Sequence, residues 1–527
     1  MRRTAVPAAV AVLACAALAA CGADYAGNGS SKARAGVTDV QERVTSVDWG
    51  ACDLQGMFQG RELDAAQAAW AEALECGAIK VPVDYEDPGG LQVRLAMVRH
   101  PATAADKTGS LLVNPGGPGG SGVELAAQPF LPDAVTAAFD VVGFDPRGVG
   151  ASANLTCGSE DAFDAAVTDV YTDDPSAITD AQAEALKTGA QDFSGECAQE
   201  EDPVFLDNIG TMNVARDLEV MRAALGDDQL TYLGYSYGTY IGQMYLYLYP
   251  HKVRAMVLDG VMRTSGSVLD VAEGQATGFE TAWRDFAAYC LTVDGCPLSS
   301  VDAADTELTA ILTQAQERVG GGLTVADMLD MIAQSLYSEA KWPALEKVLA
   351  GVAAGTLEQF VQDLQDLAGD EGSSRPLRLP PIPLPRRDSD ADFYGVQCAD
   401  RDNPGHFGAY RNSAEAAFGN SALFGAGISW SYLPCATWPA DEPNPSKVDG
   451  RGAATAVLVG NTGDPATPYA WAEQVASDLD DAVLVTYEGS GHTAYALGHE
   501  CVDAPVTAYL IGLTVPEQGL RCPQELG

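Results

Sequence analysis

The chain has 527 residues, of which 47% are hydrophobic and 20% are charged. These proportions are typical of a globular protein and exclude a disordered chain, and the length allows a large core or more than one domain. The formal net charge of −43 argues against nucleic acid as a partner, because its phosphates would be repelled. A solvated acidic surface that aids solubility is the simplest interpretation of this charge.

Residues 1–20 are predicted to be a lipoprotein signal peptide. Two arginines precede an apolar run from Ala5 to Ala20, which is too short to span a bilayer as a mature helix. The run ends in LAACG, which resembles the lipobox of bacterial lipoproteins, so we expect cleavage before Cys21 and a lipid anchor on it. A plain signal cleavage nearby is the alternative. We therefore expect an exported protein, secreted or anchored to the outer face of the cell membrane, with residues 21–45 as its tether.

The cysteine count predicts disulfides. Twelve cysteines, less Cys15 and Cys21, leave an even number in an exported chain. Sequence alone does not determine the pairing, but joining neighbours along the chain suggests Cys52–Cys76, Cys157–Cys197, Cys290–Cys296, Cys398–Cys435 and Cys501–Cys522. Zinc is the alternative use of cysteines, yet the chain has no Cys-x-x-Cys pair and only five histidines. No metal site and no organic cofactor are predicted.

Eight short runs rich in Val, Leu, Ile and aromatic residues predict β-strands. They lie at 79–85, 91–98, 110–114, 139–145, 230–235, 253–258, 455–460 and 482–487. The first two are close together, like an antiparallel pair, and the last six lack clean alternation, as strands buried on both faces do. Helical stretches such as 214–225 and 237–249 separate several of them. This alternation predicts an α/β fold with a mostly parallel, eight-stranded sheet.

A long helical insert interrupts the predicted sheet. Between residues 261 and 452 the strand pattern stops, and apolar residues recur at three- and four-residue intervals. Residues 46–260 and 453–527 are therefore predicted to form one core, with the insert after the sixth strand acting as a lid. The proline-rich stretch at 375–387 fits a surface loop of this insert better than a ligand for a proline-recognising domain.

Ser236 is the candidate nucleophile. It lies in GYSYG, directly after the predicted strand 230–235 and before a helical run. In this context Gly-x-Ser-x-Gly is typical of a nucleophile elbow, where a serine tops a sharp strand-to-helix turn. A serine hydroxyl needs a base, and His492 in GSGHT follows the last predicted strand on a glycine-rich loop, so it is preferred over the other four histidines.

The other parts of a hydrolase site follow predicted strands too. Asp464 in GDPATP lies upstream of His492 and would orient the imidazole, in the order Ser, Asp, His of an α/β-hydrolase; Asp259 is the competing acid. The oxyanion would be bound by the backbone N–H of Tyr237 and by that of Gly117 in NPGGPGGSG, with Gly116 as second choice. Because no Gly-Lys-Ser/Thr follows this loop, a nucleotide site is disfavoured.

Five motifs together resemble one family: NPGGPGGSG, FDPRGVGAS, GYSYGTYIG, GDPATP and GSGHT. They resemble those of the secreted tripeptidyl aminopeptidases of the prolyl-aminopeptidase-like α/β-hydrolases, and are similar to those of mycobacterial cell-envelope serine proteases, which are lipobox lipoproteins. The resemblance runs from about residue 45 to the C-terminus and implies the α/β-hydrolase fold with the same triad, Ser236, Asp464 and His492.

The resemblance also assigns supporting residues. It implies that Asp145 and Arg147 support the loop near the oxyanion hole and that Thr467 influences the geometry of Asp464. Simple prolyl aminopeptidases carry HGGPG where this chain has NPGGPG. The change retains Gly117 but puts a preference for a single N-terminal proline in doubt.

The activity implied is that of an exported serine exopeptidase that removes short peptides, which we expect to be tripeptides, through an acyl-enzyme on Ser236. A free N-terminus needs a carboxylate for its ammonium, about 10 Å away for three extended residues; Glu273, Glu280 and Asp400 of the insert are candidates. The alternatives are a carboxylesterase or lipase-like hydrolase with the same triad, and a non-catalytic surface protein. We expect peptide or small ester substrates, membrane contact only through Cys21, and a monomer.

Overall fold

The computed structural model describes residues 31–44, 46–58, 63–319, 324–354, 391–440 and 443–524. The predictions of a signal peptide, of lipidation at Cys21 and of a loop at 375–387 lie outside these residues. Among the helices that the structure describes, none is long and apolar enough to cross a bilayer.

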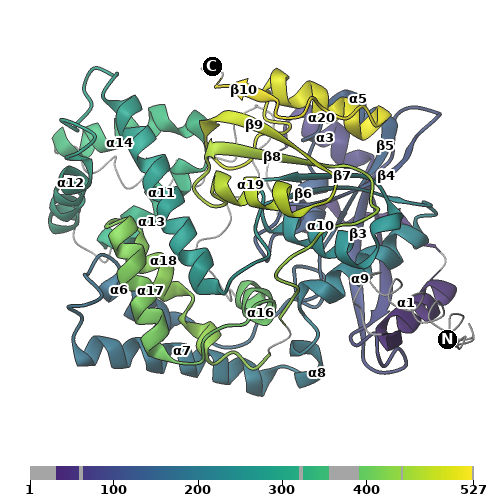
Figure 1. Cartoon of the computed structure of the whole chain (residues 1–527), viewed down its shortest axis with the longest axis horizontal. Coiled ribbons are helices and arrows are strands. Elements are labelled where there is room, and N and C mark those ends of the chain that lie inside the picture. Colours follow the sequence, from purple (N-terminus) through teal and green to yellow (C-terminus); the bar gives the residue numbers. More distant parts are fainter. Residues whose placement is uncertain are drawn as a thin grey trace, which may run out of the picture.

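A ten-stranded sheet lies at the centre of the molecule, in the order β1-β2-β3-β5-β4-β6-β7-β8-β9-β10 (Figure 1). The strands are β1 (Gly50–Ala51), β2 (Glu75–Pro82), β3 (Gln92–His100), β4 (Gly109–Asn114), β5 (Phe139–Phe144), β6 (Leu230–Tyr235), β7 (Val253–Asp259), β8 (Ala456–Gly463), β9 (Ala482–Ser490) and β10 (Arg521–Pro523). Neighbours from β5 across to β10 pair in parallel, whereas β1, β2 and β3 pair antiparallel. All eight predicted strands are present, and β1 and β10 add a short strand at each edge.

Helices cover both faces of the sheet. One face carries α2 (Leu54–Phe58), α3 (Ala65–Glu72), α4 (Gly122–Ala126), α5 (Asp133–Ala138) and α20 (Glu500–Gly512). The other carries α1 (Ser31–Arg43), α9 (Thr211–Ala224), α10 (Tyr237–Leu248) and α19 (Tyr469–Asp478). Successive residues of a strand point to opposite faces, so Tyr232 packs in one apolar core and Leu233 in the other.

Helix α1 occupies much of the segment that was predicted to be a tether. Residues 21–45 were expected to hold the body away from a membrane, but from Ser31 the chain is helical and packs on α9. Val37 and Val40 are buried there, and Gln41 Nε2 donates a hydrogen bond of 3.0 Å to Glu219 Oε1. The apolar residues recur at helical spacing and so form one buried face, which the composition of the segment did not reveal.

Apart from η1 (Pro250–Lys252), which follows α10, the remaining described helices come from two insertions, which together we call the cap. The first, between β5 and β6, contains α6 (Asp161–Val170), α7 (Asp180–Glu200) and α8 (Pro203–Leu206). The second, between β7 and β8, contains α11 (Val268–Cys290), α12 (Ala304–Val319), α13 (Val325–Leu336), η2 (Glu339–Lys341), α14 (Trp342–Ala354), α16 (Ala391–Ala399), α17 (Phe407–Asn420), α18 (Gly425–Ser431) and η3 (Leu433–Ala436). Figure 1 shows both groups on the lower and left side of the view.

The two insertions pack together. Helix α18 contacts α6, η3 contacts α7, and Ser194 Oγ of α7 donates a hydrogen bond of 3.2 Å to Pro434 O. The predicted insert at 261–452 therefore accounts for only one of the two parts of the cap. The first part, with helices between residues 161 and 206, was not predicted.

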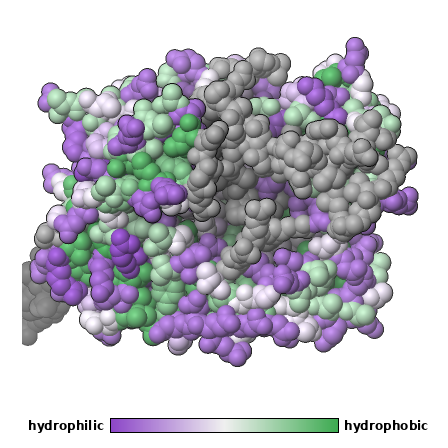
Figure 2. All heavy atoms as spheres, turned by 180° about the vertical axis from the view of Figure 1, so that it is seen from behind, coloured by the Kyte–Doolittle hydropathy of each residue, from purple (hydrophilic) through white to green (hydrophobic). Residues whose placement is uncertain are grey.

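Five disulfides connect neighbouring parts of the chain. They are Cys52–Cys76, Cys157–Cys197, Cys290–Cys296, Cys398–Cys435 and Cys501–Cys522, the same pairs that joining neighbours suggested. The last ties α20 to the edge strand β10. Hydrophilic side chains are spread over much of the face seen in Figure 2, as expected for a chain with a net charge of −43.

Candidate active site

Ser236 stands at a sharp turn between β6 and α10. Its backbone has φ 54° and ψ −123°, a conformation that non-glycine residues rarely adopt. The turn needs glycine on both sides, because a Cβ at Gly234 would lie 2.4 Å from Gly238 O and one at Gly238 would lie 2.8 Å from Asn114 O. The Ser236 N–H donates to Asp259 O at 2.9 Å. The local sequence therefore folds as the nucleophile elbow that the motif predicts.

Asp464 and His492 meet at the carboxyl edge of the same sheet. Asp464 follows β8, His492 follows β9, and His492 Nδ1 lies 2.9 Å from each carboxylate oxygen of Asp464. Both side chains are buried. Since a carboxylate only accepts hydrogen bonds, this contact places a proton on Nδ1 and leaves Nε2 of the neutral ring as the basic atom.

A shell of hydrogen bonds holds Asp464 in place. Its Oδ1 accepts the backbone N–H groups of Ala466 and Thr467 at 2.9 and 2.8 Å. Its Oδ2 accepts the Thr467 hydroxyl at 2.9 Å, and that hydroxyl also lies 3.3 Å from His492 Nδ1. Thr467 therefore touches both members of the pair.

The basic atom of His492 is not hydrogen-bonded to Ser236 in the described structure. Nε2 is buried and has no hydrogen-bond partner among the described residues. The Tyr337 ring meets the imidazole edge-on with 5.4 Å between ring centres, and Tyr337 O accepts the His492 N–H at 2.9 Å. Catalytic hydrogen bonds in free enzymes are often long and tighten when substrate binds, so this geometry suits a base for Ser236.

Asp259, the competing acid, binds backbone N–H groups and not the imidazole. It accepts the backbone N–H groups of Ala494 and Tyr495 at 2.8 to 3.2 Å, and no hydrogen bond joins it to His492 in the described part of the chain. Burial raises the pKa of Asp259 to about 7. The geometry thus makes Asp464 the partner of the imidazole and Asp259 the residue that holds the histidine loop.

The glycine-rich loop after β4 approaches the elbow closely. A Cβ at Gly116 would lie 2.5 Å from Tyr235 O and 2.8 Å from Tyr237 N, and the Gly116 N–H already donates to Asn114 Oδ1 at 2.9 Å. The N–H groups of Gly117 and Tyr237 donate to no other described residue. These two groups are therefore available to an oxyanion, and Gly117 is a better candidate than Gly116.

Asp145 and Arg147 stabilise the surroundings of this loop. Asp145 Oδ1 accepts the Ser121 hydroxyl at 2.6 Å and so ties the start of α4 to the chain after β5, while burial raises its pKa. Arg147 is fully buried and donates to Asp217 at 2.7 and 2.8 Å. Neither lines the cavity that contains Ser236, which fits the structural role that the resemblance implied.

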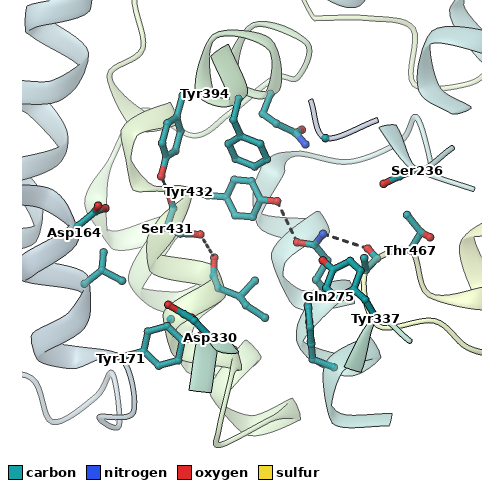
Figure 3. Close-up of a pocket in the computed structure, with 18 of the residues that line it drawn as sticks. Asp164, Tyr171, Ser236, Gln275, Asp330, Tyr337, Tyr394, Ser431, Tyr432 and Thr467 are labelled. Atoms are coloured by element: carbon teal, nitrogen blue, oxygen red, sulfur yellow. Dashed lines mark hydrogen bonds between the residues drawn. The ribbon is translucent and has the colours of Figure 1, made fainter. Parts of the chain in front are cut away.

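A cavity with about 980 Å³ of space, part of it open to solvent, contains Ser236 and Gly117 (Figure 3). Its wall is largely aromatic and comes from both insertions of the cap: Phe163, Tyr171, Phe279, Tyr337, Phe393, Tyr394 and Tyr432. Gln275 joins two parts of the wall, because it accepts the Tyr432 hydroxyl at 3.1 Å and donates to Ala466 O at 3.2 Å.

The three predicted amine anchors lie elsewhere. None of Glu273, Glu280 and Asp400 lines this cavity. Glu280 pairs with Arg284 at 2.6 Å, and Asp400 is buried, where it accepts the Thr211 N–H at 2.7 Å and burial raises its pKa to about 6. Glu273 is partly buried on α11, and burial raises its pKa.

Two other carboxylates line the cavity, Asp164 on α6 and Asp330 on α13 (Figure 3). Sequence reasoning missed both, because the direction of a cap side chain depends on how the helices pack. Only for Asp330 did the spacing in the sequence give an indication. It precedes Tyr337, another residue of the cavity wall, by seven positions, which is close to two helical turns. Among the described residues, no group of three or more His, Cys, Asp and Glu side chains is placed to hold a metal ion.

The comparisons with known proteins agree with this geometry. A family model described as TAP-like protein matches residues 421–522, which include Asp464 and His492. Over 482 residues the chain is 35% identical to serine protease Hip1 of Mycobacterium tuberculosis, with 85% of this chain and 87% of that protein covered. The chain belongs to the TAP-like family of serine hydrolases. The predicted family and the predicted α/β-hydrolase fold are thus confirmed.

Two further relatives of this TAP-like hydrolase are similar over most of their length. It is 30% identical to the tripeptidyl aminopeptidase of Streptomyces coelicolor over 494 residues, which cover 90% of this chain and 86% of that one. It is 36% identical to carboxylesterase B of Mycobacterium tuberculosis over 496 residues, covering 89% and 92%. Among solved structures, the proline iminopeptidase of Mycobacterium smegmatis matches with 15% identity and a TM-score of 0.32, over 82% of this chain and 97% of that one.

Proposed function

We propose that this TAP-like hydrolase is an exported serine exopeptidase that releases tripeptides from free N-termini. The observation that carries the proposal is the position of Ser236 in a cavity walled by both insertions of the cap. Such a wall favours the end of a peptide chain over its middle. The names of the relatives Hip1 and tripeptidyl aminopeptidase support a peptide substrate.

The proposed reaction proceeds through an acyl-enzyme. His492 Nε2 takes the proton of the Ser236 hydroxyl as Oγ attacks the carbonyl carbon of the scissile peptide bond. The negative oxygen that forms is stabilised by the N–H groups of Gly117 and Tyr237. Asp464 stabilises the imidazolium through Nδ1–H while His492 returns the proton to the leaving amine.

The second half of the reaction repeats the first with water. The acyl group of the N-terminal peptide is now an ester on Ser236 Oγ, and the shortened substrate has left with a free amine. His492 removes a proton from a water molecule, whose oxygen attacks the ester carbonyl. Collapse of the intermediate releases the peptide as a carboxylic acid and returns the proton to Ser236.

Export and lipidation form a separate part of the proposal. We propose that residues 1–20 are removed and that Cys21 carries a lipid, which leaves residues 22–30 between the lipidated cysteine and α1. Five disulfides support an oxidising compartment. Labelled palmitate should enter the wild-type protein in its bacterial host and should not enter Cys21→Ala; equal labelling of both would refute the anchor.

A carboxylesterase is the second candidate function. Carboxylesterase B is 36% identical to this chain, and the same triad can transfer an acyl group from an ester to water. The triad therefore does not distinguish an ester from an amide substrate. The distinction lies in whether the cavity recognises a peptide with a free amine.

The experiment compares four substrates of the purified mature protein: Ala-Ala-Pro-anilide, its N-acetylated form, a single-residue anilide and a short-chain nitrophenyl ester. We expect preference for the free-amine tripeptide, and loss of its turnover in Ser236→Ala. Turnover of the ester alone would show that the protein acts as an esterase and not as a peptidase. Equal turnover of free and acetylated tripeptides would exclude an enzyme that selects N-termini.

A further inference from the structure

Helix α16 contributes three neighbouring side chains to the wall of the cavity that contains Ser236: Phe393, Tyr394 and Gln397. Gln397 follows the two aromatic residues by four and three positions, a spacing that places all three on one face of a helix. The Tyr394 hydroxyl is used within the cap, where it donates to Ser431 O at 2.9 Å. Gln397 therefore brings a carboxamide into a largely aromatic surface.

Contacts on both sides fix the position of α16. The residue after Gln397 is Cys398, which forms a disulfide with Cys435 of η3 in the cap. Asp400, directly after the helix, accepts the backbone N–H of Thr211 at 2.7 Å, at the start of α9 on the face of the sheet. The helix is thus tied to the cap and to the core, so the Gln397 side chain begins from a fixed backbone position.

The Gln397 carboxamide is nearly buried and unpaired. The residue is 4% exposed, and its side chain makes no hydrogen bond with any residue that the structure describes. The other glutamine of the wall, Gln275, differs, because its Oε1 accepts the Tyr432 hydroxyl and its Nε2 donates to Ala466 O (Figure 3). Since buried polar side chains nearly always have a partner, the polar groups of Gln397 are suited to a molecule that enters the cavity.

The groups that a carboxamide offers match those of a peptide backbone. A carboxamide has an acceptor oxygen beside a donor NH₂ group. An extended peptide residue presents the complementary pair, because its N–H and C=O point to the same side, as they do when antiparallel strands pair. The acyl chain of a simple ester has neither group beyond its reacting carbonyl. The carboxamide therefore favours a peptide over an apolar acyl chain.

We propose that Gln397 binds the backbone of one residue in the acyl part of the peptide, with Oε1 accepting that residue's N–H and Nε2 donating to its carbonyl. The proposal rests on the exopeptidase function proposed above and names the residue by which the same cavity distinguishes a peptide from a simple ester. In Ala-Ala-Pro-anilide the bound residue is the second alanine, because proline has no N–H and the first residue carries the ammonium. A substrate without these groups leaves the carboxamide unpaired and is disfavoured.

The first test uses the full mature protein with Gln397→Met, which keeps an unbranched side chain and removes its hydrogen-bonding groups. We expect kcat/KM on Ala-Ala-Pro-anilide to fall about 5- to 50-fold, as for one or two lost hydrogen bonds between neutral groups. Turnover of the short-chain nitrophenyl ester should stay within about twofold. Gln474→Met is the matched control and should equal the wild type on both substrates, because Gln474 donates to Ser265 Oγ and lies outside the cavity wall.

Two outcomes of this test would overturn the proposal. An equal loss on the anilide and the ester would mean that Gln397 only supports the fold. Unchanged kinetics on both substrates would mean that its carboxamide does not bind the peptide.

A change in the substrate tests the same contact without altering the protein. Lactic acid in place of the second alanine replaces its N–H by an ester oxygen and leaves the anilide that is released unchanged. For the wild type we expect kcat/KM for anilide release to fall about 5- to 10-fold. In Gln397→Met the same change should cost less than about twofold, because the acceptor of this N–H is already gone. An equal loss in both proteins would contradict the proposed contact.

The failure of this proposal differs from the failure of the proposed function. If the wild type cleaves Ala-Ala-Pro-anilide and Gln397→Met cleaves it equally well, the exopeptidase stands and Gln397 is not its backbone contact. If the wild type turns over the ester alone, the exopeptidase and the contact are both wrong.

Discussion

Asp259, at the end of β7, accepts a hydrogen bond of 2.8 Å from the backbone N–H of Tyr495, three residues after His492. A second backbone N–H, from Ala494, reaches the same carboxylate. The loop that carries the base is thus held by a buried acid. Burial raises the pKa of Asp259 to about 7, because the charged form has lost its hydration.

This pKa predicts a pH-dependent stability. The pKa in the unfolded chain is about 3.9, so the stabilisation associated with Asp259 is complete below about pH 4 and is lost as pH rises through about 7. Each unit of difference corresponds to ~1.4 kcal/mol of unfolding free energy. In Asp259→Asn this loss should disappear, so Tm should fall less between pH 5 and 8 than in the wild type. Parallel Tm curves from thermal melts of both proteins would contradict the prediction.

Replacing Asp464 by Asn should abolish most of the activity while preserving the fold. The amide oxygen can still accept the N–H groups of Ala466 and Thr467, but the amide does not stabilise an imidazolium and favours the wrong tautomer of His492. We expect kcat to fall about 10³- to 10⁴-fold. Steady-state kinetics on an ester and an anilide would measure this. A loss below tenfold would mean that another acid supports His492.

Thr467 should contribute to catalysis through its hydroxyl alone. Thr467→Val removes the hydrogen bond of 2.9 Å to Asp464 Oδ2 and keeps nearly the same volume. A net hydrogen bond of ~1 kcal/mol corresponds to a decrease of about 5- to 10-fold in kcat. Thr467→Ser retains the hydroxyl and is the matched control, expected within about threefold of the wild type. Equal kcat values of the valine variant and the wild type would show that the Thr467 hydroxyl does not contribute to catalysis.

Replacement by alanine should lower kcat at one glycine and leave it unchanged at another. Gly116 has φ 98°, and a Cβ there would lie 2.5 Å from Tyr235 O, so Gly116→Ala should displace the oxyanion loop and lower kcat by at least 100-fold. Gly195 lies within α7, where a Cβ would meet nothing within 4 Å. Gly195→Ala should leave kcat unchanged and raise stability by up to ~1 kcal/mol. Similar kcat values for both variants would argue against a close approach of loop and elbow.

Much of the core follows from local patterns in the chain. A strand buried on both faces is a continuous apolar run, and each of the eight predicted runs corresponds to a strand in the sheet. The added strands β1 and β10 span two and three residues, too few to form a pattern. They exist because their backbone groups pair with β2 and β9, which lie beside them only in the folded molecule.

The candidates Ser236, Asp464 and His492 and their order could be read from the chain alone. Each follows a strand, and parallel strands bring such loops to one edge of the sheet. Which acid meets the imidazole follows from the packing of the folded chain, since Asp259 and Asp464 both occupy such positions and differ only in the groups that surround them. This packing also decided which carboxylates line the cavity. Two insertions far apart in the chain pack to form that wall, and the direction of a side chain on a cap helix depends on this packing.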